Sequence, residues 1–334
     1  MFRGADKPIT VETVADPLPG TGELVLKVGR CGICGSDVHL TTEHGWMPIN
    51  MPLGHEYAGE VVAIGKGVDD FCMGDIVTAL PAAGCGHCPA CVQGLPLFCD
   101  RPSEMTFCAG GFAEYVRVVA RTSVRLPVSL SMADGALVEP LSVSLHAVAL
   151  AKLQPGAKVL VLGAGSIGLG VAYWARKLGA RRIVVAARSR KRQEQAASIG
   201  ADVFVQCGEG EFEAVKDALG GSPDVVFECN GAVGALGQAI AHVRTQGTVV
   251  SLGLCTKPDP VIPAAATFKQ VSMVFSMAYS LEEFRFTVDM LDRGHVEPRQ
   301  WLGAPIPLEA VPDKILSMRL EGAEEVKVQV DPFL

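Results

Sequence analysis

The 334-residue sequence predicts an α/β protein with a β-rich domain and a second domain built on a doubly wound parallel sheet, and three observations lead to this prediction. The chain is longer than one hydrophobic core usually supports. Its first third has valine-rich runs broken by glycines, which is typical of antiparallel strands. From about Gly156 onward, apolar runs alternate with helical stretches, which is typical of parallel strands covered by helices.

In the β-rich part, four runs predict the strands of a compact antiparallel barrel. They are ELVLKVGRCGICGSD (23–37), EYAGEVVAIGKGV (56–68), MGDIVTAL (73–80) and FAEYVRVV (112–119). The tail EEVKVQVDP (324–332) predicts a final strand that returns to this domain. We therefore assign residues 1–145 and 278–334 to the first domain.

The second domain, residues 146–277, repeats a strand-then-helix unit. Predicted strands are KVLVL (158–162), RIVVAA (182–187), DVVFECNG (224–231), TVVSLG (248–253) and VSMVFS (271–276). Helices are predicted over 166–179, 190–200 and 235–247. After the last strand, Ser280 and Glu283 have the spacing of a capping box and Gly294 follows an apolar repeat, so a helix is predicted over 280–294.

Charge and hydropathy narrow the classes of partner. With a formal net charge of −7, the protein has no general attraction to phosphate backbones or anionic lipids, so neither nucleic acid nor a membrane is expected as a partner. The sequence contains no apolar run long enough to span a membrane, and its start lacks the apolar segment of a signal peptide. We expect a cytoplasmic protein.

Four of the eleven cysteines are clustered between residues 84 and 100. Cys85, Cys88, Cys91 and Cys99 have the spacing C-x2-C-x2-C-x7-C. Disulfides are rare in a reducing compartment, and four thiolates form a closed tetrahedral zinc site with no position left for substrate. The spacing predicts a structural zinc lobe; four unrelated buried cysteines are the alternative.

Three glycines follow the first predicted strand of the second domain. Gly163, Gly165 and Gly168 form G-x-G-x-x-G between that strand and a helix. Glycines in this position let the backbone approach a pyrophosphate at the helix N-terminus. Because the whole strand–turn–helix unit is present, the motif predicts a dinucleotide-binding Rossmann domain, and a turn that serves only close packing does not explain it.

A second constellation lies in the first domain. Cys34, His55 and Glu56 supply a thiolate, an imidazole and a carboxylate, which can hold zinc while one position stays open for water or a substrate oxygen. By spacing alone, a buried core thiol and a core histidine that is fully hydrogen-bonded are an equal alternative.

The order of GICGSDVH, GHEYAGEV, the four-cysteine lobe, EPLSV and GAGSIG resembles the zinc-dependent medium-chain alcohol dehydrogenases, and most closely their polyol, threonine and butanediol dehydrogenase branch. The resemblance covers nearly the whole chain. It implies a GroES-like catalytic domain, two zinc ions per chain, hydride transfer to or from a nicotinamide nucleotide, and a homotetramer or homodimer.

The resemblance also implies roles for single residues. Those near the metal are Cys34, His55, Glu56 and Glu139 as ligands of a catalytic zinc, Asp37 orienting His55, and Ser36 and His39 passing a proton to solvent. Ile167 would press against the nicotinamide ring. In the polyol branch an Arg-Tyr pair that grips hydroxyls stands where this chain has Ser276 and Met277. Phe107, Trp46 and the segment 276–279 are candidates to approach the substrate, and a place in the core is an equal alternative for each of them.

The end of the second strand of the Rossmann domain predicts which nucleotide binds. NAD-dependent proteins of this fold carry an acidic residue there, whereas this chain has Ala187. Arg188, Ser189 and Arg192, with Arg190 and Lys191 nearby, offer donors suited to a 2′-phosphate. A solvated basic start of a helix is the alternative. We expect NADP(H) to be preferred over NAD(H).

These inferences combine into one functional prediction: a zinc-dependent, NADP(H)-preferring dehydrogenase that interconverts a secondary alcohol or diol, as its small-molecule substrate, and the matching ketone. Three alternatives remain open. They are a polyol dehydrogenase of the sorbitol type, a non-catalytic protein that binds zinc and a nucleotide, and a zinc-free quinone or enoyl reductase, which would lack Cys34, His55 and Glu56.

Overall fold

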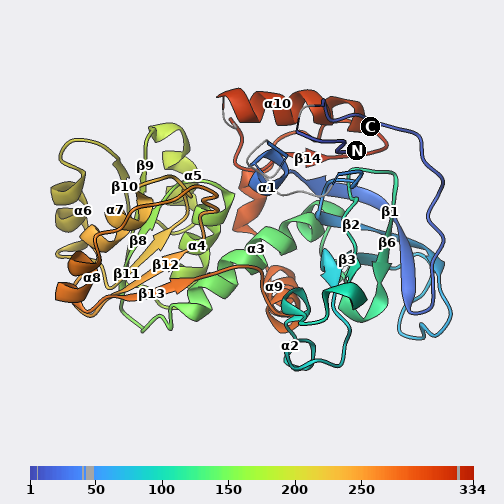
Figure 1. The fold of residues 1–334 in the computed structure, drawn as a ribbon, viewed down its shortest axis with the longest axis horizontal. Helices are drawn as coiled ribbons and strands as arrows, with labels where there is room; N and C mark the ends of the chain where they lie inside the picture. Colours follow the sequence, from blue (N-terminus) through green and yellow to red (C-terminus); the bar gives the residue numbers. More distant parts are fainter. Residues whose placement is uncertain (6, 40, 43–48, 322–323) are drawn as a thin grey trace. The chain divides into compact units, whose positions relative to one another are not determined.

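The computed structural model describes residues 1–334 except 6, 40, 43–48 and 322–323, and it confirms the predicted fold class (Figure 1). The chain forms two compact units. Unit 1 comprises Met1–Glu139 and Tyr279–Leu334, and unit 2 comprises Pro140–Ala278. Trp46 lies outside the described residues.

Unit 1 is built on a six-stranded sheet in which every pairing is antiparallel. Its path is β14 (Gln329–Val330), β1 (Glu23–Gly32), β2 (Glu56–Ile64), β3 (Ile76–Ala79) and β7 (Ser123–Arg125), with β6 (Tyr115–Val119) also paired to β1. Since β6 continues through one 3-10 turn into β7, the sheet curls back on itself. Among the described strands, β6 pairs with β1 and β7 pairs with β3, so the continuous run from β6 to β7 links the two ends of the β1–β2–β3 path, as expected of an antiparallel barrel.

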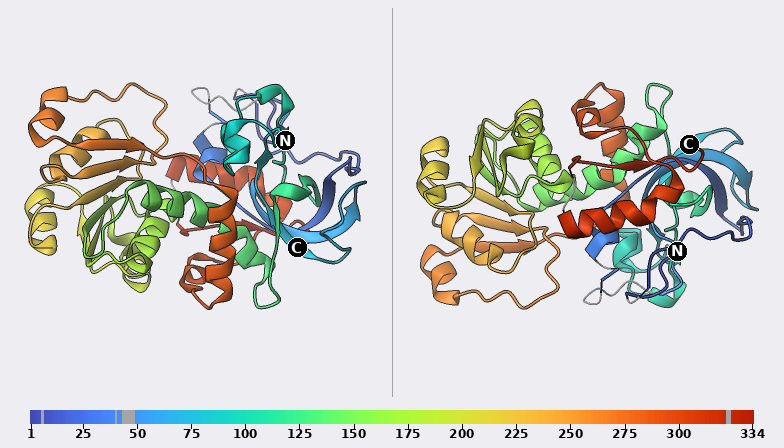
Figure 2. Two further views of the ribbon diagram at one scale, coloured as in Figure 1. Left: turned by 90° about the horizontal axis from the view of Figure 1, so that it is seen from below. Right: turned by 90° about the horizontal axis from the view of Figure 1, so that it is seen from above.

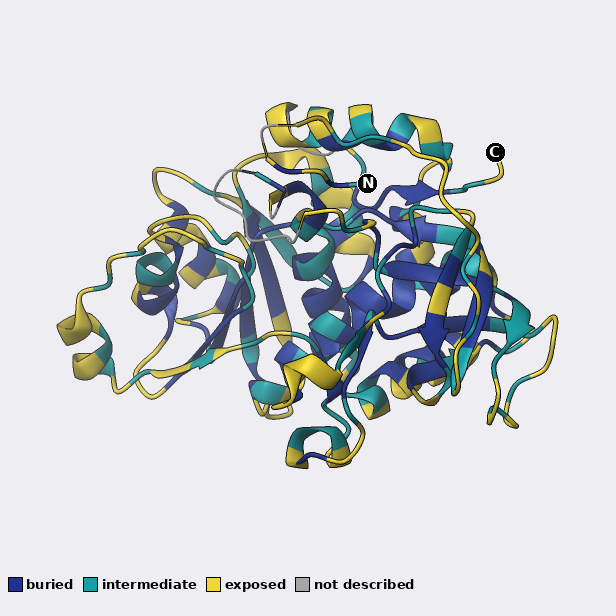
Figure 3. Cartoon of the chain, turned by 45° about the vertical axis from the view of Figure 1, so that its right-hand side comes forward, coloured by how far each residue is buried: buried dark blue, intermediate teal, exposed yellow. Residues whose placement is uncertain are grey.

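The core of unit 1 lies against β1. Leu24, Leu26 and Val28 alternate along this strand, are fully buried, and contribute to one cluster with Val77 and Val118. This alternation is the period-two pattern of a strand with one face on a core. Figure 3 colours the chain by burial, with buried residues in dark blue. The returning tail is confirmed, because β14 pairs with β1.

Unit 2 has a six-stranded, all-parallel sheet, shown from two further sides in Figure 2. Its order is β10 (Val203–Gln206), β9 (Arg182–Ala187), β8 (Lys158–Leu162), β11 (Val225–Glu228), β12 (Thr248–Ser251) and β13 (Ser272–Phe275). All five predicted strands are present. The helices of this unit are α4 (Ser166–Lys177), α5 (Gln193–Ser198), α6 (Glu211–Leu219), α7 (Ala235–His242) and α8 (Pro263–Lys269).

The helix expected over 190–200 begins differently. Arg190–Arg192 form a short 3-10 turn, and the α-helix starts only at Gln193. Strand β10 and helix α6 were not predicted, and they complete the alternation of strands and helices.

The remaining helices flank the sheet of unit 1 or join the two units. They are α1 (Gly35–His39), α2 (Pro89–Val92), α3 (Met132–Leu150), α9 (Leu281–Asp292) and α10 (Val311–Glu321), and a small ribbon pairs β4 (Ala82–Ala83) with β5 (Thr106–Phe107). Helix α3 starts in unit 1 and ends in unit 2. The capping box of α9 is confirmed: the Glu283 amide donates to Ser280 Oγ, and the Ser280 amide donates to the Glu283 carboxylate. Within the described ranges, none of the helices has both the length and the apolar character that a transmembrane span needs.

Candidate metal centres and nucleotide site

The four clustered cysteines of unit 1 converge on one point. The Sγ atoms of Cys85, Cys88, Cys91 and Cys99 all lie within 4.8 Å of one another. The Cys85–Cys91 and Cys88–Cys99 sulfur pairs are 4.0 and 3.8 Å apart. Four sulfurs at about 2.3 Å from a tetrahedral ion are about 3.8 Å apart, so the cluster fits zinc, whereas a disulfide needs about 2.0 Å.

Two further features of this lobe agree with a bound cation. Burial and the neighbouring thiols raise the pKa of Cys91 to about 12, so a positive charge is needed before all four thiols ionise. The backbone also makes room for the sulfurs: a Cβ on Gly84 would lie 2.4 Å from Cys91 Sγ and 2.9 Å from Cys99 Cβ. Only glycine fits there.

The second candidate metal set is assembled by strand register. Antiparallel pairing of β1 with β2 places Gly32 opposite Glu56, so Cys34, just beyond β1, comes next to His55, just before β2. The structure brings Cys34, His55 and Glu56 together, with one ligand atom of each within 4.8 Å of the others. A thiolate, an imidazole and a carboxylate in this arrangement fit a zinc ion.

Asp37 lies behind His55. Its side chain is 1% exposed, its Oδ1 is 3.6 Å from His55 Nδ1, and its Oδ2 accepts a hydrogen bond from the Cys34 amide at 2.9 Å. Burial disfavours a charged imidazole, but the Asp37 carboxylate outweighs burial and raises the pKa of His55 well above its usual value. Metal binding at His55 Nε2 would therefore release a proton from this ring.

Glu56 has a partner that the sequence did not suggest. The Lys327 ammonium lies 2.7 Å from both Glu56 carboxylate oxygens and 3.2 Å from the Ile33 carbonyl oxygen. Lys327 immediately precedes Val328, whose carbonyl accepts from the Ile33 amide, so the strand returning at the end of the chain delivers this lysine. A buried carboxylate is thus neutralised beside the metal set.

Glu139 reaches the same region from helix α3. It is buried, and burial raises the pKa of its carboxyl to about 7, with the neighbouring His55 acting in the opposite direction. Its oxygens do not belong to the set of described ligand atoms that lie within 4.8 Å of one another. The Tyr279 side chain, also fully buried, is its other close neighbour.

The other residues predicted to act in the site differ in how far they are buried. Ser36 and His39 both belong to the short helix α1, three residues apart, where side chains share one face; Ser36 is half-buried and His39 is exposed. Phe107 is on β5 and is 64% exposed. In unit 2, Ser276 Oγ is buried and Met277 is exposed.

The glycine turn of unit 2 follows β8 and opens α4, as the motif predicts. Gly163 has φ +111°, and a Cβ on Gly168 would lie 2.0 Å from the Gly163 carbonyl oxygen, so both positions require glycine. A Cβ on Gly165 would enter open space at the helix N-terminus. That space is where a pyrophosphate fits, next to unpaired amide groups and the positive end of the helix dipole.

Strand β9 ends at Ala187, the position where an acidic residue would contact a ribose. Arg188 and Ser189, which follow it, are exposed. Arg192 has a different position: its Nη1 donates to the Ala164 carbonyl oxygen at 3.0 Å, inside the glycine turn. Arg188 is therefore an exposed arginine at the end of the strand, whereas Arg192 is hydrogen-bonded to the glycine turn.

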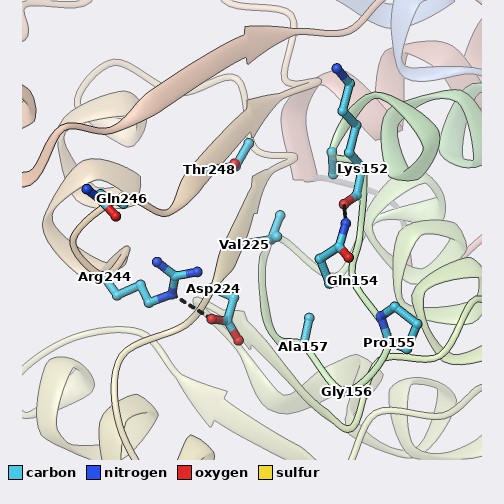
Figure 4. Close-up of a pocket in the computed structure, with 11 residues that line it drawn as sticks. Lys152, Gln154, Pro155, Gly156, Ala157, Asp224, Val225, Arg244, Gln246 and Thr248 are labelled. Carbon is cyan, nitrogen blue, oxygen red and sulfur yellow. Dashed lines mark hydrogen bonds and ion pairs between the residues drawn. The ribbon is translucent and has the colours of Figure 1, made fainter.

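Unit 2 also contains a cavity of about 330 Å³, whose lining residues are shown in Figure 4. It is lined by Gly156, Ala157, Val225 and Thr248, at the beginnings of β8, β11 and β12, whereas the glycine turn follows the end of β8. The Arg244 and Asp224 side chains that line it pair with each other at 2.6 Å. This cavity is separate from the candidate nucleotide site.

Comparison with known families matches both units. Residues 20–128 match the alcohol dehydrogenase GroES-like domain, and residues 166–293 match the zinc-binding dehydrogenase domain.

Curated relatives and a solved structure extend the match to most of the chain. The chain is 36% identical to a sorbitol dehydrogenase of Bacillus subtilis over 74% of this chain and 72% of the relative. It is 30% identical to the (R,R)-butanediol dehydrogenase of the same organism over 98% of this chain and 97% of the relative. The crystal structure of a zinc-binding dehydrogenase from Sinorhizobium meliloti 1021, bound to NADP, superposes with a TM-score of 0.86 at 32% identity, over 96% of this chain and 94% of that chain.

Proposed function

Since this chain belongs to the zinc-binding alcohol dehydrogenase family and is an oxidoreductase of that type, we propose that it interconverts a secondary alcohol or diol and the matching ketone with NADP(H). The observation that carries the proposal is the convergence of Cys34, His55 and Glu56 in unit 1. Bound zinc supplies a Lewis acid for the substrate oxygen, and the nicotinamide accepts or donates the hydride.

The residues of unit 1 have separate roles in this proposal. Cys34, His55, Glu56 and Glu139 are the proposed ligands of the catalytic zinc: the first three converge, Glu56 is also paired with Lys327, and Glu139 lies near the fourth position. Asp37 fixes the orientation of His55 through the ring nitrogen that faces away from the metal. Ser36 and His39, on one face of α1, carry the hydroxyl proton of the substrate toward solvent. Cys85, Cys88, Cys91 and Cys99 hold a second, structural zinc.

In unit 2, the glycine turn binds the pyrophosphate and Ile167 lies against the nicotinamide. Ala187 leaves room for a 2′-phosphate because it brings no negative charge, and Arg188 and Ser189 supply donors to that phosphate. Solved relatives do not decide this preference, because the Sinorhizobium meliloti structure is bound to NADP and an Escherichia coli structure is complexed with NADH.

The substrate is more apolar than a polyol. Met277 is an exposed apolar side chain, and Ser276 is short, at the place where a polyol enzyme would need groups that grip hydroxyls. The likeness to a butanediol dehydrogenase supports a diol. A polyol is the second candidate, because the chain is also 36% identical to a sorbitol dehydrogenase.

The test is steady-state kinetics on the zinc-loaded protein with both nucleotides and a panel of 2-butanol, 2,3-butanediol, acetoin, sorbitol and xylitol. The highest kcat/KM should belong to a secondary alcohol, a diol or its ketone with NADP(H). Sorbitol or xylitol as the best substrate by far would refute the substrate class. Elemental analysis should give two zinc ions per chain, and full activity with one or none would refute the metal assignment.

We also propose that the protein assembles as a homodimer or homotetramer through the edge of the unit 2 sheet. Strand β13 is the last strand of that sheet, and Met273 and Phe275 on it are 36% and 68% exposed. An exposed apolar edge strand is a ready surface for pairing with a second chain. Light scattering coupled to size-exclusion chromatography should show a dimer or tetramer, and Phe275→Lys should shift it toward monomer.

A further inference from the structure

The hydroxyl of Tyr279 has no hydrogen-bond partner among the described residues, although the side chain is 0% exposed. A buried hydroxyl without a partner is costly, and native structures hold few such groups. Tyr57, buried in the same unit, shows the ordinary arrangement: its hydroxyl donates to the Cys108 carbonyl oxygen at 2.7 Å. The Tyr279 hydroxyl therefore indicates that a neighbouring acceptor turns toward it when the site is loaded.

The ring and the backbone of Tyr279 both restrict the position of this hydroxyl. The Tyr279 ring stacks on Phe284, with centroids 5.6 Å apart and planes 12° from parallel. Ser280, the next residue, caps helix α9, and Ala278, the preceding one, has φ +58°, a conformation that is rare for alanine. Because neither the ring nor the backbone turns easily, the direction of the hydroxyl is fixed.

Those surroundings are the candidate catalytic centre. Glu139 is the carboxyl group beside the hydroxyl, and Glu56 and Tyr57 are farther neighbours. Both oxygens of Glu56 already accept hydrogen bonds from Lys327. Among these carboxylates, Glu139 is thus the one suited to accept a further hydrogen bond.

We propose that Tyr279 is a positioning residue for Glu139: its hydroxyl donates a hydrogen bond to one carboxylate oxygen, so that the other oxygen faces the zinc. The inference rests on the proposed role of Glu139 as a zinc ligand. A carboxylate that binds a metal is normally held by a hydrogen bond from behind, which fixes its orientation and favours its ionised form. The proposal also explains why an unpartnered hydroxyl is retained in the core.

The test measures zinc affinity in Tyr279→Phe by competition with a chelator. This substitution keeps the ring that stacks on Phe284 and removes only the hydroxyl. Because cobalt bound by four thiolates and cobalt bound by one differ in their charge-transfer bands, cobalt substitution reports the catalytic site separately. We expect the affinity of the catalytic site to fall by about 10- to 100-fold, while the melting temperature of the metal-free protein is unchanged or higher.

Two further variants make the outcome decisive. Glu139→Gln should weaken the catalytic metal, and Tyr279→Phe on that background should weaken it no further. Tyr57→Phe, the matched control, should lower the melting temperature without changing metal affinity. Unchanged affinity in Tyr279→Phe with weakened binding in Glu139→Gln would overturn this inference alone. Unchanged affinity in Glu139→Gln would instead overturn the ligand role of Glu139.

Discussion

Lys327 places its ammonium nitrogen 2.7 Å from both carboxylate oxygens of Glu56, and the two side chains are 1% and 0% exposed. This is a fully buried ion pair beside the candidate catalytic zinc. Nearby charges favour the charged lysine over the opposing effect of burial, and they raise the pKa of Lys327. The pair neutralises Glu56, which belongs to the candidate metal set with Cys34 and His55.

Removing the lysine should destabilise the metal-free protein most. Lys327→Met leaves Glu56 buried without a counter-charge, which costs about 3–5 kcal/mol. Zinc offers Glu56 another positive partner, so the loss should be smaller in the loaded protein. Chemical denaturation with and without zinc measures the difference. Lys327→Met with Glu56→Gln should recover most of the loss, and an equal loss in both metal states would contradict the pairing described here.

The metal-free protein should become less stable as pH rises. Burial raises the pKa of Glu139 from its ordinary 4.5 to about 7. Between these two pH values the folded state therefore holds a proton that the unfolded state has released. The free energy of unfolding should fall by about 3 kcal/mol between these pH values. The raised pKa of His55 acts in the same direction above about pH 6.5.

Urea denaturation at pH 5 and pH 7.5 tests this dependence on the metal-free protein. Glu139→Gln should remove much of the slope, whereas Glu194→Gln, at an exposed position, should leave it intact. A wild-type protein that gains stability over this interval would show that Glu139 is not held in its protonated form.

Gly84→Ala should disrupt the structural zinc. The added methyl group would lie 2.4 Å from Cys91 Sγ and 2.8 Å from the Pro96 carbonyl oxygen, and neither has room to move inside the knot. We expect zinc content to fall toward one ion per chain, with a lower melting temperature. Gly237→Ala is the matched control, because its Cβ meets nothing within 4 Å. It lies in helix α7, where alanine is favoured by about 1 kcal/mol.

The two arginines near the nucleotide should behave differently. Arg188→Ala removes a donor proposed for the 2′-phosphate, so KM for NADP(H) should rise about 10- to 100-fold and KM for NAD(H) should hardly change. Arg192→Ala removes the hydrogen bond to the Ala164 carbonyl in the glycine turn and should weaken both nucleotides. Equal losses with both nucleotides in Arg188→Ala would refute the phosphate contact.

Elements with a local signal could be predicted from the sequence. Except for β10, the described strands of unit 2 are short apolar runs between glycines and helices, and each lies where its run predicts it. The convergence of Cys34, His55 and Glu56 could be anticipated because each belongs to a long motif whose order is informative. The capping box before α9 was visible because its two residues are three positions apart.

Features that depend on residues far apart in the sequence leave no local pattern from which they could be predicted. Lys327 occupies an alternate position of a final strand, where a lysine usually faces solvent, and its partner Glu56 lies 271 residues away in sequence. Helix α3 was not predicted because it is buried on nearly all sides, so its sequence lacks a polar stripe, and Pro140 interrupts the pattern. Tyr279 has no sequence signal, because its distinguishing feature is a buried hydroxyl without a partner, which arises only from packing.

The two metal sets also differ in how much of the chain must be synthesised before each exists. The four-cysteine knot is contained within fifteen residues, Cys85–Cys99, so a nascent chain presents all its sulfurs as soon as that stretch leaves the ribosome. The catalytic set draws on Cys34, His55 and Glu56, and the counter-charge of Glu56 arrives only with Lys327. Zinc acquisition during biosynthesis thus has an order: the structural ion can be bound early, and the catalytic centre is completed only when the last strand docks on β1.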